Sequence, residues 1–175
     1  MNLNELTLVQ TRLNVLINQP LTHVGRAADM LTLCFGDRFN LHIQCYYRLT
    51  EQGRTIFARN DVYQPSEAMW NMWRLMGYEE DYIPEDFHSD DVGANRLDEA
   101  LERLNSDLEG LTVRAAMLNQ LGDLTLVFQC DATLTIMADT SGGEECWRLF
   151  EVDAEHLVVY GDGAELVGPG YDNHE

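Results

Sequence analysis

The chain contains no lysine, and all eleven of its basic residues are arginine. The Walker-A phosphate loop, Schiff-base catalysis and pyridoxal chemistry each require a lysine side chain. A G-x-G-x-x-G loop after a predicted strand is also missing. The sequence therefore disfavours nucleotide binding by the familiar loops and catalysis that depends on lysine.

The sequence also lacks long apolar runs and paired cysteine motifs. No apolar run reaches the length of a membrane span, and the first residues lack the basic and then apolar layout of a signal peptide. The four cysteines form no C-x-x-C pair and lie in or beside apolar segments, at Cys34, Cys45, Cys130 and Cys146. We expect reduced, buried cysteines in a soluble cytoplasmic protein, without a disulfide or zinc framework.

Negative charge is present in large excess and is unevenly distributed. The formal net charge is -19, and residues 79–110 hold twelve acidic and two basic side chains. Residues 151–175 hold seven acidic side chains and no basic one. Such a field repels nucleic acid and anionic membranes and attracts basic proteins or metal cations, although charged runs are most often simply solvated surface.

One apolar pattern occurs twice in the chain. The pattern L-T-L-x-F-x5-L-x-I is found at residues 31–43 and again at residues 124–136. Arg12-Leu13-Asn14 corresponds in order to Arg103-Leu104-Asn105, and Arg48-Leu49 to Arg148-Leu149. Because Leu, Phe and Ile alternate within the pattern, it is typical of a half-buried antiparallel sheet. We interpret the chain as a single domain built from two pseudo-repeated halves.

Each half shows a helical segment followed by several short strand-like segments. Helices are predicted over residues 3–18 and 95–108 from their apolar spacing. Strands are predicted at residues 21–24, 30–35, 40–49 and 54–63, and again at 111–118, 123–129, 133–138, 146–152 and 156–160. The sequence therefore predicts an α+β fold in which each half is one helix and an antiparallel meander of about five short strands, with the helices on one side of the sheet.

The predicted boundaries leave one segment outside the duplication. Half-repeat 1 covers about residues 3–63, half-repeat 2 covers about 95–162, and residues 163–175 are expected to form a flexible acidic tail. Residues 64–94 form an insertion without a counterpart in the other half. Insertions of this kind often carry function, since they are presented by a rigid frame.

The insertion contains a helix predicted to start near Pro65 or Ser66 that is rich in tryptophan and methionine. Such side chains suit an adaptable binding surface, and they equally suit a helix that covers an open end of a sheet. The candidate partner-binding residues are Met69, Trp70, Met72, Trp73, Met76, Tyr78 and Tyr82.

Two weaker candidate sites follow from other side chains. The acidic run Glu85, Asp86, His88, Asp90 and Asp91 could hold a divalent cation, although it does not match the calcium-binding loop and also fits a solvated loop.

The matched residues Arg48 and Arg148 could clamp an anion in a cleft between the halves. They could instead pair with nearby carboxylates, Asp61 in the first half and Asp153 or Asp162 in the second. No catalytic residue and no cofactor is predicted.

These observations favour a non-enzymatic, acidic binding protein that contacts a protein partner through its insertion. A basic protein is the partner that the charge favours, as for an inhibitor or immunity-type protein. One alternative is a small-molecule or divalent-metal-dependent enzyme with a cleft between the halves, and another is a homodimer or larger assembly joined through an edge strand. Nucleic acid and membranes are not expected partners.

Overall fold

The computed structural model describes residues 1–79, 82–85 and 87–169, and its elements belong to the α+β class, as predicted. The helices are α1 (Leu3–Leu13), α2 (Glu67–Leu75) and α3 (Arg96–Ser106), with two short 3-10 helices, η1 (Asn14–Leu16) and η2 (Arg59–Tyr63). The first five strands are β1 (Leu21–Ala27), β2 (Met30–Phe35), β3 (Phe39–Ile43), β4 (Tyr46–Glu51) and β5 (Arg54–Ala58). The remaining strands are β6 (Val113–Leu118), β7 (Leu124–Phe128), β8 (Thr133–Met137), β9 (Glu145–Glu151), β10 (His156–Tyr160) and β11 (Ala164–Val167).

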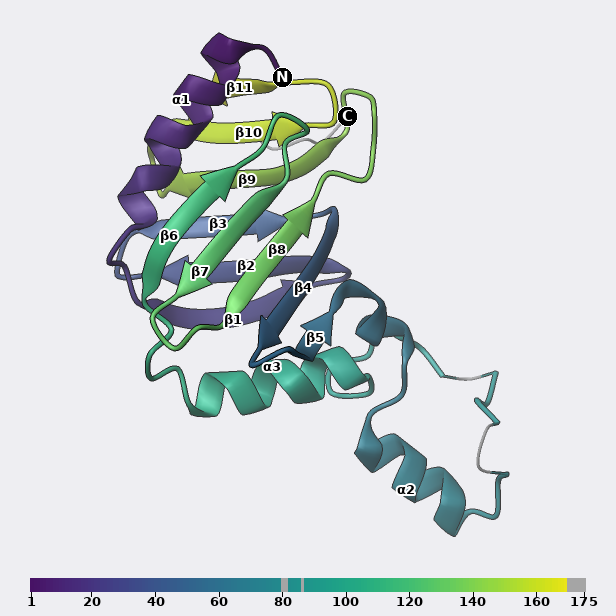
Figure 1. Cartoon of the computed structure of the whole chain (residues 1–175). Helices are drawn as coiled ribbons and strands as arrows, with labels where there is room; N and C mark the ends of the chain where they lie inside the picture. Colours follow the sequence, from purple (N-terminus) through teal and green to yellow (C-terminus); the bar gives the residue numbers. More distant parts are fainter. Residues whose placement is uncertain (80–81, 86, 170–175) are drawn as a thin grey trace.

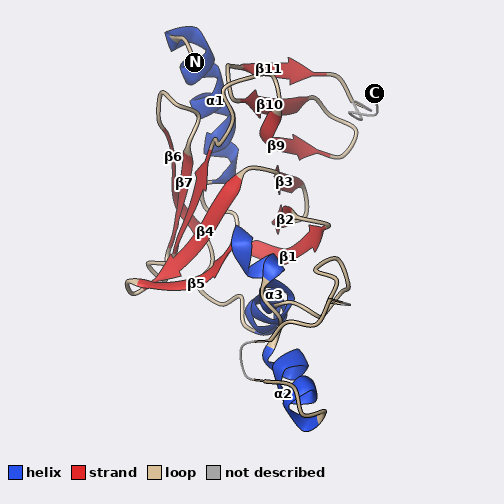
Figure 2. Ribbon diagram, turned by 90° about the vertical axis from the view of Figure 1, so that its right-hand side faces the viewer, coloured by secondary structure: helices blue, strands red, loops and turns tan. Residues whose placement is uncertain are grey.

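The strands form two antiparallel sheets, and this differs from the predicted meander with helices on one side. One sheet has the order β1-β2-β3-β9-β10-β11 and the other has the order β5-β4-β8-β7-β6. The two sheets face each other as layers (Figure 2). The core between them is made of the alternating apolar residues, among them Leu31, Leu41, Leu126 and Trp147.

Each sheet combines strands from before and after the insertion. The chain leaves the first sheet after β3 and enters the second at β4, and it returns between β8 and β9. Strand β3 therefore pairs with β9, where Leu41 lies opposite Leu149. Strand β4 pairs with β8, where Leu49 lies opposite Leu134. The two parts of the chain are interleaved, and neither forms a separate lobe.

Two helices cover opposite edges of the sandwich (Figure 1). Helix α1 begins at Asn2, whose side chain forms a capping box with Glu5, and it packs against the edge strand β6. Helix α3 begins at Asn95 and packs against the edge strand β1 and against η2. Helix α1 also contacts the edge strand β11, and α3 also contacts the edge strand β5, so the two helices lie against all four edge strands, which could otherwise pair with another chain.

The predicted flexible tail at residues 163–175 begins with ordered structure. Strand β11 pairs with β10, with Leu166 opposite Leu157. Ala164 and Leu166 pack against the core, which explains why this short segment is held in the sheet. The last part of the predicted tail, residues 170–175, lies outside the described residues. No helix in the described residues is long and apolar enough to cross a membrane.

Candidate functional site

The insertion leaves the body as an arm that ends in α2 (Figures 1 and 2). We call residues 67–93 the arm, and residues 64–66 and 94–96 the neck. The two neck strands are hydrogen-bonded: Ser66 N–H donates to Ala94 O at 2.8 Å, and Arg96 N–H donates to Gln64 O at 2.7 Å. The arm therefore starts and ends at adjacent points on the surface of the body.

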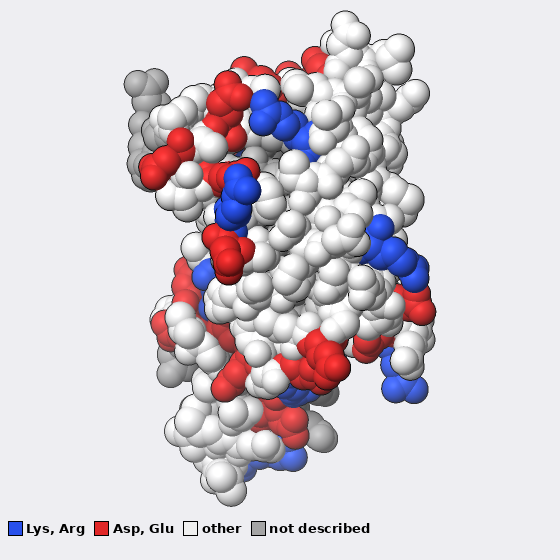
Figure 3. Space-filling view, turned by 90° about the vertical axis from the view of Figure 1, so that its left-hand side faces the viewer, with Lys and Arg blue, Asp and Glu red and all other residues white. Residues whose placement is uncertain are grey.

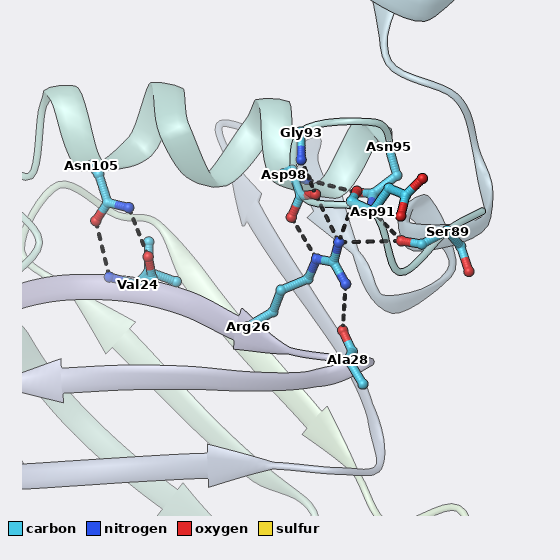
Figure 4. A network of polar contacts seen from close by, with 9 residues as sticks. All are labelled: Val24, Arg26, Ala28, Ser89, Asp91, Gly93, Asn95, Asp98 and Asn105. Atoms are coloured by element: carbon cyan, nitrogen blue, oxygen red, sulfur yellow. Dashed lines mark hydrogen bonds and ion pairs between the residues drawn. The ribbon is translucent and has the colours of Figure 1, made fainter. Parts of the chain in front are cut away.

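A buried ion pair fixes the returning end of the arm to the first sheet (Figure 4). Arg26 of β1 and Asp98 of α3 form two hydrogen bonds, of 2.5 and 2.8 Å, and their side chains are only 6% and 11% exposed. Arg26 also donates to Ser89 O at 3.2 Å, and Gly93 N–H donates to Asp98 at 2.7 Å. Asn95 donates to Ser89 O at 2.8 Å and caps α3 through Asp98 N–H.

The electrostatics of this anchor favour a charged pair. Burial alone would raise the pKa of Asp98, but the hydrogen bonds from Arg26 and from Gly93 N–H hold that pKa below its ordinary value. The hydrogen bond to Asp98 raises the pKa of Arg26 despite burial. Both groups are therefore ionised at neutral pH, and the anchor is strong where the arm meets the body.

Helix α2 begins and ends where the local sequence requires. The Ser66 side chain accepts the Met69 N–H at 3.3 Å, which is the N-cap expected after Pro65. The chain turns away after Met76 at Gly77, which has a φ of 87°. Since side chains rarely adopt this left-handed conformation, glycine at this position ends the helix. The predicted start of the helix is confirmed.

The arm has a small aromatic core of its own. Trp73 is only 4% exposed, and its ring meets those of Trp70 and Phe87 edge-to-face, with centroids 5.3 and 5.9 Å apart. Trp73 therefore holds α2 against the loop by which the arm returns to the body. Of the predicted partner-binding residues, this one is placed inside the arm, and Met69 and Trp70 are half-buried.

One face of helix α2, together with two tyrosines beside it, gives the arm an exposed apolar patch. Met72, Met76, Tyr78 and Tyr82, which the sequence singled out, are exposed, and the two tyrosine rings stack at 5.5 Å. Leu75 is 90% exposed beside Met72 and Met76. In Figure 3, the lowest part of the molecule, which is the arm, presents mainly uncharged atoms with acidic residues directly above them. Met72, Leu75 and Met76 therefore form one solvated apolar face on α2.

A groove of about 560 Å³ lies between α2, α3 and β5. Its walls include Trp70 and Ile56, and Ile56 has no partner in the register of β4 and β5 because a bulge interrupts the pairing there. A bulge at an edge strand redirects the side chain that it carries. The bulge therefore contributes an apolar side chain to the wall of the groove.

Charged groups of both signs surround this groove. Glu99 pairs with Arg103 and accepts the Glu67 N–H at 3.1 Å, which keeps its pKa below the ordinary value. Arg74 and Arg96 also line the groove, and neither forms an ion pair within the described residues. The groove thus offers aromatic surface together with charges that a ligand could reach.

The matched arginines occupy different sheets. Arg48 is exposed on β4 opposite Thr135, whereas Arg148 lies on β9 opposite His42. Arg148 pairs with Glu145, at 2.6 Å from its Nε, and both side chains are largely buried. The sequence offered Asp153 or Asp162 as possible partners of Arg148, and the structure pairs it with Glu145 on its own strand. The predicted partner of Arg48, Asp61, instead accepts the Ala58 N–H at 2.9 Å.

The predicted metal ligands lie along the loop by which the arm returns to the body. Glu85, His88, Asp90 and Asp91 are exposed, and Asp86 lies outside the described residues. Within the parts of the chain that the structure describes, no three His, Cys, Asp or Glu side chains come together as metal ligands would. The backbone carbonyl of Asp91 faces Arg26, at 3.5 Å, and so takes part in the anchor.

The predicted binding residues did not include Leu75, an apolar side chain of the arm that is 90% exposed, or the cations of the groove. Leu75 shares a helix face with Met72 and Met76 at helical spacing, so a search for periodicity would have found it. Arg74 and Arg96 lie in separate helices, and only the fold brings them together. Comparisons with protein-family models, curated proteins and solved structures gave no match, so function has to be inferred from the residues themselves.

Proposed function

We propose that the chain is a non-enzymatic binding protein whose arm contacts a basic protein partner. The observation that carries this proposal is the solvated apolar face of Met72, Leu75 and Met76 on a helix that projects from the body. Interfaces place apolar anchors at the centre and polar groups at the rim, and the arm has this arrangement.

The charge of the arm selects the kind of partner. Residues 67–93 carry eight carboxylates and one arginine, in a chain with a net charge of -19. A field of this sign speeds the approach of a cationic protein and repels a second copy of this chain or a nucleic acid. The apolar face then supplies short-range affinity, so the partner is expected to combine basic and apolar surface.

The interleaved body supports the proposal as a rigid platform for the arm. We also infer that its two halves arose by duplication, because the strand registers within the two sheets correspond. His42 lies opposite Arg148 in one sheet, and Thr135 lies opposite Arg48 in the other. Under the sequence repeat, His42 corresponds to Thr135 and Arg148 to Arg48. The arm is the segment that has no equivalent in this scheme.

Single charge substitutions on the arm and on the body test the proposal. The tagged wild-type chain, Leu75→Glu and Leu121→Glu are each incubated with lysate of the source cells, and bound proteins are quantified by mass spectrometry at low and high salt. Leu121 is a matched control, because it is 74% exposed on a turn of the body, compared with 90% for Leu75.

The expected result is a basic protein that the wild type and Leu121→Glu retain and that Leu75→Glu recovers at least about tenfold less well. Recovery of that protein should also fall at high salt, since charge steers its approach. Equal recovery by all three proteins would overturn the assignment of the arm as the contact surface. An acidic protein captured through Leu75 would retain the surface and overturn the partner class.

A further inference from the structure

Two cysteines that the proposed function does not use lie where the chain crosses between the sheets. Cys45 is in the connection between β3 and β4, and Cys146 is the second residue of β9. Cys45 N–H donates to Cys146 O at 3.1 Å, and the neighbouring Gln44 N–H donates to the same oxygen at 2.9 Å. The two backbones are therefore within one hydrogen bond of each other.

Both thiols are reduced and buried in the same core, with residue exposures of 2% for Cys45 and 0% for Cys146. The hydrogen bond between the two thiols is the largest cause of the pKa shift of each. It raises the pKa of Cys45 and lowers the pKa of Cys146. The N···O distance of 3.1 Å between the two backbones keeps their Cα atoms close together, as a disulfide requires, with a Cα separation of about 4.4–6.8 Å.

We propose that Cys45 and Cys146 form an intramolecular disulfide when the protein is exposed to hydrogen peroxide. The Cys146 thiolate attacks one peroxide oxygen, the O–O bond breaks, and the displaced hydroxide takes up a proton to become water. The sulfur of Cys146 is then a sulfenic acid. The Cys45 sulfur attacks this sulfur, the S–O bond breaks, and the S–S bond forms. The departing hydroxide takes the proton of the Cys45 thiol and leaves as a second water. Two thiols are oxidised and one peroxide is reduced to two waters.

The position of the two cysteines gives this bond a large effect on stability. It would tie the first crossover of the chain to β9, and so join the two interleaved parts of the chain covalently. The closed loop spans about 100 residues, for which the loss of entropy in the unfolded chain is near the upper end of the usual range. The oxidised protein should therefore melt about 10 °C above the reduced protein.

The other two cysteines are excluded from the experiment by substitution. Cys34 and Cys130 are only half-buried, so peroxide reaches them more easily. The variant Cys34→Ser/Cys130→Ser retains the buried pair alone, and it is treated with peroxide while folded. Intact mass, peptide mapping after alkylation and the melting temperature are measured before and after treatment, and again after reduction.

The expected result is a loss of two hydrogens in mass, a peptide that links Cys45 to Cys146, and a rise in melting temperature that reduction reverses. A third substitution, Cys45→Ala, should replace the loss of hydrogens by a gain of oxygen and abolish the rise. Peptide mapping of the wild-type chain gives the same readout without substitutions. Recovery of Cys45 and Cys146 as separately alkylated or separately oxidised peptides would overturn the proposal.

Discussion

The side-chain amide of Asn105 forms both hydrogen bonds that the backbone of Val24 offers on the edge of the first sheet. Its nitrogen donates to Val24 O at 2.7 Å, and its oxygen accepts the Val24 N–H at 3.0 Å (Figure 4). The Gln10 side chain of α1 forms two similar hydrogen bonds with the edge strand β6. It donates to Ala116 O at 2.9 Å and accepts the Leu118 N–H at 3.2 Å. In both places a helix side chain takes the position of a neighbouring strand.

Removing this amide should destabilise the fold. Asn105→Ala leaves a backbone donor and acceptor of β1 without partners, and we expect the free energy of unfolding to fall by about 2 kcal/mol. Urea denaturation measures the change. Asn71→Ala is the control, because Asn71 is exposed on α2. Equal stability of the two variants would show that the edge contacts contribute nothing.

Breaking the ion pair between Arg26 and Asp98 at the base of the arm should lower the free energy of unfolding by more than the loss of the Asn105 amide does. Asp98→Asn keeps the size of the side chain but leaves the buried guanidinium of Arg26 without its anionic partner, and we expect a loss of about 3 kcal/mol. Glu102→Gln, on an exposed position of the same helix, should change stability by less than about 0.5 kcal/mol. Similar losses in both variants would contradict a special role for the pair.

The contribution of the Asp98 carboxylate to stability should depend on pH. The folded-state pKa of Asp98 is lowered, so its contribution is fully present above its unfolded pKa of about 3.9 and is lost as pH falls through the folded pKa. The stability difference between the wild type and Asp98→Asn should therefore be constant near neutral pH and shrink below about pH 4. Urea titrations across this range provide the measurement, and a difference that grows on acidification would contradict the prediction.

A chain cut within the arm should remain one particle. Each sheet contains strands from both sides of the arm, so separating the two fragments would expose the core. After cleavage at an engineered protease site behind Ile83, which is exposed, the fragments should elute together from a sizing column and separate only in denaturant. Separation in native buffer would show that the interleaved strands do not hold the fragments.

The arm should open independently of the body. Trp73 holds the arm through Trp70 and Phe87, so Trp73→Ala should speed hydrogen exchange of α2 amides at least about tenfold and leave the amides of β3 and β9 unchanged. Mass spectrometry of peptides resolves the two regions. Leu75→Ala is the control, since Leu75 contributes no buried surface. Faster exchange throughout the chain would mean that Trp73 supports the whole fold.

Sequence patterns predicted the elements better than their arrangement. The α+β class, the start of α2 and most strands followed from periodicity and capping residues. The predicted strand at 40–49 is instead two strands in different sheets. The sequence predicted a single strand because the alternation of buried residues runs unbroken from Leu41 through Cys45 to Leu49. A period of two gives no signal where a chain changes sheets, so the two-layer architecture could not be predicted.

Amino-acid composition predicted where the candidate site lies but not which of its side chains are buried. Tryptophan and methionine content located the arm, and Met72 and Met76 lie exposed on it. Composition could not distinguish Trp73, which faces the inside of the arm, from the exposed Leu75. That distinction depends on which helix face meets Phe87, a residue that is distant in sequence from both.

The hydrogen-bonded neck allows the arm to be replaced by another loop. Because Ser66 and Ala94 are adjacent, a loop of almost any length can be spliced between them without changing the path of the chain on either side. Loop-closure entropy rises slowly with length, so a replacement that keeps the contacts of Ser89 O and Gly93 N–H with Arg26 and Asp98 would cost the body little. The sequence of the arm can thus change, in evolution or by design, while the two sheets formed by the described residues stay the same.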